Sequence, residues 1–212
     1  MSLILSLHPQ TPQARSIHKA GAFLLQGKVV AAPWGGQSVL LGLPTSAKAI
    51  EALLPAQKKQ ARGHWLLLGA GLSDLSAYVR IDNAIFPRLK PHVPSDEYCF
   101  MVPPTARMAK CLHNKALDKI AICCPSAPCY TALLAATDSP ILAYCQHSVA
   151  LPPENETDGQ FDIERCAVAC RLEAVSFNDD EDREAAPSVI DLTAVPPTVC
   201  VVGAGDTTDF SV

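Results

Sequence analysis

The sequence predicts an α/β protein: a mixed, twisted, open sheet flanked by helices and built as one domain over residues 1–212. Two observations carry this prediction. Apolar, β-branched runs alternate along the chain with segments of helical periodicity, a pattern typical of layered α/β folds. A chain of 212 residues with a hydrophobic fraction of 49% is also long and apolar enough to bury a core.

In the first third of the chain the expected order is strand, helix, strand, helix, strand. These elements are predicted at residues 3–7, 12–25, 29–32, 46–54 and 65–68. Gly27 follows the first helix as a stop signal, Pro33 is expected to end the second strand, and Ser46 is a candidate N-cap for the second helix.

The rest of the chain continues this alternation. We expect a helix, a strand, a basic helix, a strand, a helix and a strand at residues 82–89, 98–102, 107–117, 120–124, 129–136 and 141–143. Cys166 and Cys170, four residues apart, are predicted to share one face of a helix. The stretch 151–159 and the acidic run 178–182 are predicted to be loops.

The end of the chain predicts a β-hairpin. Two β-rich segments flank Pro196-Pro197, and the second segment ends on Gly203-Ala204-Gly205. Because glycine lets a backbone approach a ligand closely, this end is interpreted as a turn or a ligand-facing loop. No helix is expected after it, which argues against a dinucleotide-binding fingerprint.

The composition excludes several classes of protein. A net charge of −4 and a pI near 5.8 argue against non-specific coating of nucleic acid. No apolar stretch is long enough to span a bilayer and no signal peptide is recognisable, so we expect a cytoplasmic protein with no membrane partner. The nine cysteines are irregularly spaced without a Cys-x-x-Cys pair, so we expect reduced, buried thiols and no metal site.

Several short motifs, taken in order, resemble the YrdC/YciO-like family, and the YciO branch above all. They are Leu7-His8-Pro9, Pro12-Gln13-Ala14-Arg15, Leu72-Ser73-Asp74-Leu75-Ser76-Ala77-Tyr78, Asp82-Asn83, Tyr98-Cys99-Phe100, Pro125-Ser126-Ala127-Pro128 and the closing Pro187-Ser188-Val189-Ile190-Asp191-Leu192. The family includes the threonylcarbamoyl-AMP synthases of tRNA modification. The resemblance therefore implies a YrdC-like fold and a concave site for ATP, threonine and bicarbonate.

Carried over residue by residue, the resemblance places candidate ligand-binding residues at Pro33, Trp34, Lys58, Lys59, Arg62, Cys145, His147 and Ser188. Three positions of family arginines carry other residues here, namely Gln60, Cys123 and Val201. Each replacement removes a fixed cationic fork, which costs roughly 2 to 4 kcal/mol of transition-state stabilisation. The resemblance thus implies a degenerate active site, unless Lys59 or Arg62 supplies the missing cation.

The leading hypothesis is a diverged family member that binds a nucleotide, with ATP as the candidate, or double-stranded RNA or tRNA, without efficient threonylcarbamoyl-AMP synthesis. The alternative is an active L-threonylcarbamoyladenylate synthase acting in tRNA t6A modification, and a third is a structural or partner-binding role. Trp34 either stacks on an adenine base or plugs the cavity. The densest basic stretch is either an RNA-binding surface or a solvated helix face; it comprises Arg107, Lys110, Lys115 and Lys119. The oligomeric state is not predicted.

Overall fold

The structure is a computed structural model that describes residues 3–8, 10–59, 64–145, 168–174 and 186–210. Its strands are β1 (Leu3–Leu7), β2 (Val29–Trp34), β3 (Gln37–Gly42), β4 (His64–Leu68), β5 (Tyr98–Val102), β6 (Ile120–Cys123), β7 (Ile141–Cys145), β8 (Val168–Ala174), β9 (Ser188–Asp191) and β10 (Thr198–Val201). Its helices are α1 (Ala14–Leu25), α2 (Ala47–Lys59), α3 (Leu72–Leu75), α4 (Phe86–Leu89), α5 (Ala106–Cys111) and α6 (Pro128–Thr137), with short 3₁₀ turns at Lys90–His92 and Thr208–Phe210.

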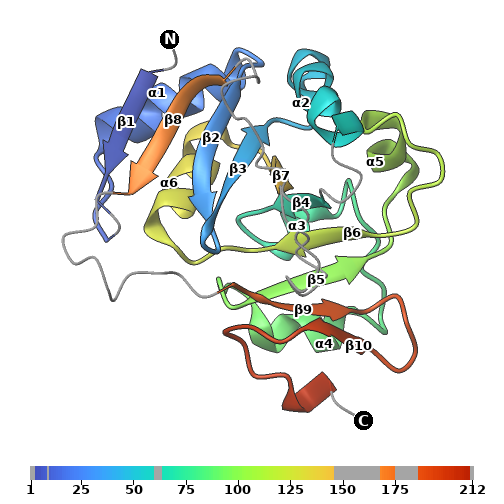
Figure 1. Ribbon diagram of the computed structural model, residues 1–212. Helices are drawn as coiled ribbons and strands as arrows, with labels where there is room; N and C mark the ends of the chain where they lie inside the picture. The colour runs from blue at the N-terminus through green and yellow to red at the C-terminus, as the bar shows by residue number, and fades with distance from the viewer. Residues whose placement is uncertain (1–2, 9, 60–63, 146–167, 175–185, 211–212) are drawn as a thin grey trace.

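The ten described strands form one mixed sheet in the order β1-β8-β2-β3-β7-β4-β6-β5-β9-β10 (Figure 1). Strand β8 pairs in parallel with both β1 and β2, although it comes much later in the chain. Parallel pairs β4–β6 and β5–β9 alternate with antiparallel pairs β4–β7 and β5–β6. The prediction of a mixed open sheet flanked by helices is therefore confirmed.

Each face of the sheet buries its own core, because successive side chains of a strand point to opposite faces. In β4, Leu66 and Leu68 join the core that also holds residues of α1 and α6, whereas Trp65 and Leu67 join the core beneath α2 and α5. Helices α1 and α6 lie together behind β8 and β2 in Figure 1. The sheet is thus covered by helices on both faces, which leaves loops at the strand ends to form sites.

The expected end of the second strand at Pro33 is wrong, because β2 continues to Trp34. The pairing of β2 with β8 is described up to Ala31, so Pro33 lies beyond the described pairing on that side, where proline is tolerated. Strand β3 was not predicted. It follows a two-residue turn in which Gly35 and Gly36 both have positive φ, 53° and 77°, as a tight hairpin requires.

The helix expected around Cys166 and Cys170 is also wrong. Cys170 lies on β8, fully buried between β1 and β2, and Cys166 lies outside the described residues. This segment is a strand because it pairs with a neighbouring strand on each side, and the four-residue spacing of two cysteines does not reveal such pairing. The loops predicted at 151–159 and 178–182 fall outside the described residues as well.

Two expected helices are shorter in the structure. The prediction for 82–89 reduces to α4, because the Asp82 carboxylate accepts hydrogen bonds from the backbone N–H groups of Ala84 and Ile85 and forms a turn before the helix. The prediction for 107–117 reduces to α5, after which His113 takes a positive φ of 52°. Turns therefore form at the start of the first predicted helix and at the end of the second, where helix was expected.

Two local predictions are confirmed. The Ser46 hydroxyl accepts a hydrogen bond from the N–H of Ala49 at 3.2 Å, as an N-cap of α2 does. The terminal hairpin forms with β9 and β10 antiparallel, Thr198 lying opposite Asp191.

The eight described cysteines are all free thiols. Within the described ranges, no helix has the length and apolar character needed to cross a bilayer.

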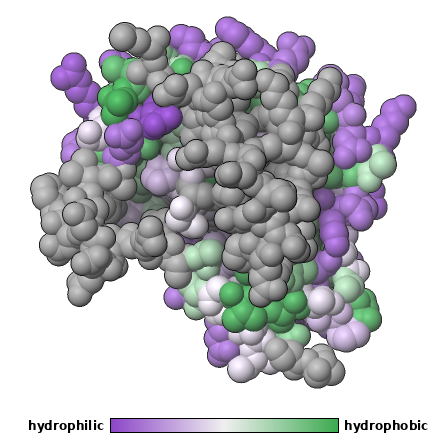
Figure 2. All heavy atoms as spheres, viewed as in Figure 1, coloured by the Kyte–Doolittle hydropathy of each residue, from purple (hydrophilic) through white to green (hydrophobic). Residues whose placement is uncertain are grey.

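The visible surface is mixed in character. Figure 2 shows hydrophilic residues along the upper edge and right side of the molecule and a group of hydrophobic residues on its lower part, in the region of hairpin β9–β10. Val195 in the turn of this hairpin and Val202 after it are 90% and 75% exposed.

Candidate functional site: the cavity beside Trp34

A cavity of about 260 Å³ lies where five segments distant in sequence converge. They are the end of β2 with its turn, the loop before β5, the start of α6, the segment before β9 and the loop after β10. The lining residues are Trp34, Gly35, Asp96, Glu97, Ala127, Tyr130, Pro187 and Ala204. Two of the predicted site residues belong to or adjoin this group, Trp34 directly and Pro33 as its neighbour in β2.

One wall of the cavity is aromatic and buried. Trp34 is 4% exposed and meets the Tyr130 ring edge-on, with centroids 4.9 Å apart and planes at 87°. The Tyr130 hydroxyl donates a hydrogen bond to the carbonyl oxygen of Pro33, which ties α6 to β2. The indole N–H of Trp34 has no hydrogen-bond partner among the described residues. Trp34 therefore forms part of the wall, with little ring surface free for a base to stack on.

Two of the lining residues are acidic. The Asp96 carboxylate accepts hydrogen bonds from the backbone N–H of Ser126, at 3.1 and 3.2 Å, and from the Ser126 hydroxyl. Ser126 lies two residues before α6, so the Asp96 carboxylate is held near the positive end of that helix without capping it. Glu97, which is exposed, is the other acidic residue of the lining. No lysine or arginine is among the described lining residues, so the wall carries negative charge.

Ser188 shapes the cavity through the C-terminal loop. Its hydroxyl is fully buried, accepts a hydrogen bond from the N–H of Gly203 at 2.8 Å and donates one to the carbonyl oxygen of Gly205 at 2.7 Å. A Cβ on Gly205 would lie 2.4 Å from the Tyr98 ring, so glycine allows the loop to pack this closely. The loop thereby brings Ala204 to the cavity, while Ser188 itself is not a lining residue.

Cys145, a predicted site residue, lies in the core. It is fully buried at the end of β7, and burial raises the pKa of its thiol well above the usual range. Cys123, at one of the family arginine positions, is 2% exposed, and a hydrogen bond with Cys99, together with burial, raises its pKa. Neither residue lines the cavity. Both thiols therefore behave as small apolar side chains in this structure.

The remaining predicted residues are placed only in part. Lys58 and Lys59 are the last two residues of α2, and only their backbone is described. Arg62 and His147 lie outside the described residues, as does Gln60 at a family arginine position. The structure therefore brings together Pro33, Trp34 and, through the C-terminal loop, Ser188.

Comparison with known families identifies the family of this chain. The family model Sua5/YciO/YrdC, described as "Telomere recombination", matches residues 22–200. The chain belongs to the Sua5/YciO/YrdC family. Among individual relatives, an uncharacterized protein of Haemophilus influenzae is 28% identical over 212 residues, covering 99% of this chain and 100% of that one. The Escherichia coli protein YciO, also uncharacterized, is 26% identical over 210 residues, with coverage of 99% and 100%.

Solved structures of family members have the same fold. The E. coli YciO crystal structure superimposes with a TM-score of 0.76 at 27% identity and covers 100% of both chains. P. abyssi Sua5 complexed with L-threonine gives a TM-score of 0.71 at 19% identity, covering 95% of this chain and 58% of Sua5. At that identity the likeness to Sua5 concerns the fold.

Sequence reasoning missed the acidic and aromatic members of the site in this Sua5/YciO/YrdC protein. Asp96 and Glu97 directly precede the predicted strand 98–102, and Tyr130 lies on a predicted helix, so their segments were recognised. Their local patterns carry no sign of a shared cavity, because Asp96 meets Ser126 across 30 residues and Tyr130 meets Pro33 across 97.

The predicted basic stretch divides into two kinds of residue. Lys119 forms an ion pair with Asp191 at 2.8 Å, and the Arg107 guanidinium lies 4.7 Å from the centre of the Tyr78 ring. Lys110 and Lys115 are at least partly exposed and form no ion pair with a described residue. Half of the stretch is thus engaged within the protein itself.

Proposed function

We propose that this protein is a diverged member of the Sua5/YciO/YrdC family that binds a nucleotide or double-stranded RNA such as tRNA and does not make threonylcarbamoyl-AMP efficiently. The observation that carries the proposal is the charge of the cavity beside Trp34. Its described wall holds the carboxylates of Asp96 and Glu97 and no lysine or arginine. Acting on ATP or tRNA would place the protein in the cytoplasm.

The physical reason is that the synthase reaction, as the family resemblance implies it, gathers anions. The triphosphate of ATP, the carboxylate of threonine and bicarbonate all require cations or convergent N–H donors, and these bonds strengthen as pyrophosphate leaves. Carboxylates on the wall repel such ligands, and the Asp96 carboxylate lies on Ser126, just before the start of α6. Loss of one cationic contact costs roughly 2 to 4 kcal/mol at the transition state.

Phosphate contacts would come from cations elsewhere. Lys58 and Lys59 end α2, and Arg62 follows three residues later in the chain, so this end of the helix is the proposed nucleotide-binding segment. Lys110 and Lys115 are the cations proposed to contact an RNA backbone, which is recognised through phosphate and sugar rather than through base edges.

The deciding experiment is isothermal titration of the full chain with ATP, with and without threonine at low salt, together with an assay of pyrophosphate release. We expect ATP affinity to be the same with and without threonine, and pyrophosphate release to stay at the level of a protein-free control. Threonine-dependent ATP binding accompanied by steady pyrophosphate release would overturn the proposal.

A matched pair of variants separates the two ligands. Lys58→Ala with Lys59→Ala is expected to weaken ATP binding, whereas Lys110→Ala with Lys115→Ala, which removes the same charge, is expected to weaken binding of double-stranded RNA. If the first pair leaves ATP affinity unchanged, the nucleotide site has been placed wrongly.

A second candidate is the active synthase of tRNA t6A modification. The observation that favours it is the fold shared with Sua5, for which a complex with L-threonine is known. In this case Lys58, Lys59 and Arg62 would replace the missing arginines as cations around the triphosphate. Pyrophosphate release that requires ATP, threonine and bicarbonate together distinguishes this candidate from the first.

A further inference from the structure

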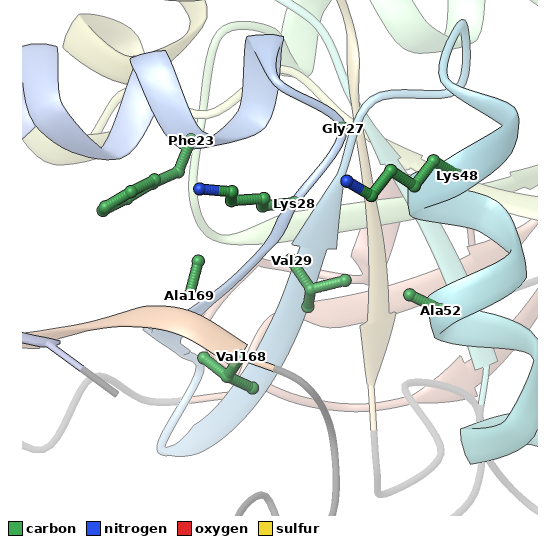
Figure 3. Close-up of a pocket in the computed structure, with 8 residues that line it drawn as sticks. All are labelled: Phe23, Gly27, Lys28, Val29, Lys48, Ala52, Val168 and Ala169. Carbon is green, nitrogen blue, oxygen red and sulfur yellow. The ribbon is translucent and has the colours of Figure 1, made fainter. Parts of the chain in front are cut away.

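A second, larger pocket of about 420 Å³ lies at the other end of β2, where the strand begins. Figure 3 shows it between the end of α1, the start of α2 and the first residues of β8. Its lining includes Phe23, Lys28, Val29, Lys48, Ala52 and Val168. None of these six residues belongs to the cavity beside Trp34 or to the site that the family resemblance implies.

Two lysines supply the charge of this pocket. Lys28 comes from the turn after α1, with its ammonium group 4.9 Å from the centre of the Phe23 ring, and Lys48 is the second residue of α2. In Figure 3 both side chains lie on the same side of the pocket, with the Lys28 ammonium group directed toward Phe23 and that of Lys48 directed toward Gly27. Neither ammonium group forms an ion pair with a described residue, and no carboxylate is among the described lining residues. The two positive charges are therefore uncompensated within the described structure.

The backbone adds to this positive potential. Helix α2 has 13 residues and its first turn contains no acidic side chain, so the positive end of its dipole is not neutralised there. This is the reverse of α6, where Asp96 is hydrogen-bonded to Ser126 at the helix start.

The rest of the lining is apolar. Val29, Ala52 and Val168 lie across the pocket from the two lysine side chains in Figure 3, and Phe23 contributes an aromatic ring at one end. Apolar surface with a few polar groups beside it is typical of sites for small organic ligands. An inorganic ion alone would leave the apolar surface without a partner.

We infer that this pocket binds a small phosphate monoester with an apolar or aromatic body. A phosphate monoester carries close to two negative charges at neutral pH, which matches two ammonium groups better than a single carboxylate does. Its phosphate lies between Lys28 and Lys48, and its apolar body lies against Val29, Ala52 and Val168. This inference goes beyond the proposed function, since it concerns a different site and does not depend on ATP or RNA binding.

The test is a two-dimensional ¹H–¹⁵N NMR titration of the full chain with phenyl phosphate as the probe, beside phenol and inorganic phosphate. We expect phenyl phosphate to shift the backbone amide signals of Gly27, Lys28, Val29 and Val168 and to bind more tightly than either fragment. Shifts centred instead on Gly35 and Ala204, which line the cavity beside Trp34, would overturn the assignment.

Two charge-matched variants decide whether the lysines hold the ligand. The double variant Lys28→Met with Lys48→Met is expected to weaken phenyl phosphate binding by about tenfold or more, as loss of charge-assisted contacts does. The double variant Arg88→Met with Lys90→Met removes the same net charge at exposed positions elsewhere on the protein and is expected to leave the affinity unchanged. Equal losses in both variants would show a general charge effect and refute the site.

A third variant tests the apolar part of the pocket. Ala52→Phe fills the pocket from α2 and keeps both lysines, so phenyl phosphate should lose its advantage over inorganic phosphate. If phenyl phosphate binds this variant as tightly as the unchanged protein, its body does not lie in the pocket and the inference is wrong. A thermal melt of each variant establishes that it is folded before the titration is interpreted.

Discussion

The two ends of β2 carry pockets of opposite character. The cavity at Trp34 is walled by buried aromatic rings and lined by carboxylates, whereas the pocket at Val29 has an apolar lining with two unpaired lysines among the described residues. The two residues are five positions apart in one strand, which is about 16 Å along an extended chain. A short distance therefore separates two places that would attract ligands of opposite charge.

The net charge of a protein therefore says little about the charge of an individual site. The chain as a whole carries −4, yet the pocket at Val29 is positive, because local charge depends on which loops meet and on whether their ions are already paired. The two pockets also differ in how they are held. Trp34 packs against the Tyr130 ring in the core, and the Asp96 carboxylate accepts a hydrogen bond from the N–H of Ser126. Lys28 and Lys48, by contrast, form no ion pair with a described residue. Changes at the first should reduce stability, and changes at the second should affect binding alone.

The largest expected effect comes from removing the aromatic wall. Trp34→Ala should lower the free energy of unfolding by about 3 to 5 kcal/mol, because it leaves a void beside Tyr130 that the sheet cannot close. Urea denaturation measures this loss. Trp34→Phe keeps a ring against Tyr130 and should lose far less. If the alanine variant is as stable as Lys28→Met, the two pockets do not differ in the way described.

Ser188→Ala should have the next largest effect. The substitution removes the buried hydroxyl that holds the N–H of Gly203 and the carbonyl of Gly205, at an expected cost of about 1 to 3 kcal/mol in unfolding free energy. Amide hydrogen exchange at Gly203 should speed up accordingly. As a control, Ser76→Ala removes a hydroxyl bonded to the carbonyl of Ser73 in an exposed turn and should cost below about 0.5 kcal/mol.

A smaller effect should follow from neutralising the acidic wall. Glu97→Gln lowers the repulsion of any anion entering the cavity beside Trp34, so the affinity for a small anion such as acetate, followed by the NMR signals of Gly35 and Ala204, should rise about threefold at low salt. Asp138→Asn makes the same change of charge at the far end of α6 and should leave the affinity unaltered. A rise of equal size in both variants would mean that the wall of the cavity has no special influence.

The smallest expected effect concerns the ion pair between Lys119 and Asp191; Lys28, by contrast, has no such partner among the described residues. Burial alone would raise the pKa of Asp191, but hydrogen bonds from Lys119 and Thr193 outweigh it and lower the pKa below the usual value. A lowered folded-state pKa means that the ionised carboxylate stabilises the protein above pH of about 4, and that this contribution is lost as the pH falls through the folded-state pKa.

Asp191→Asn should therefore lower the melting temperature slightly at neutral pH, by an amount that corresponds to at most about 1 kcal/mol because Lys119 is partly exposed. The difference between variant and unchanged protein should shrink as the pH is lowered to about 3. Melting curves across this range measure it. A difference that grows on acidification would contradict the lowered pKa.

Much of the fold could be predicted from local patterns. The strand Tyr98–Val102 was predicted at its observed bounds, and the N-cap at Ser46 and the terminal hairpin follow from turn and capping chemistry that acts within a few residues. Strand β3 had a usable signal in Gly35-Gly36, which allows a tight hairpin turn. Strand β8 had none, because only pairing with β1 and β2 makes Cys170 part of a strand.

The amino-acid sequence alone identifies the family, predicts the alternation of strands and helices, and points to Pro33, Trp34 and Ser188 as site residues. The folded structure was needed to see that Ser188 holds the C-terminal loop and that Asp96 makes one pocket acidic. These two features depend on contacts between residues far apart in the chain. Helical periodicity, caps and turns arise between near neighbours in the chain, whereas the charge of a cavity depends on which distant loops the order of strands brings together.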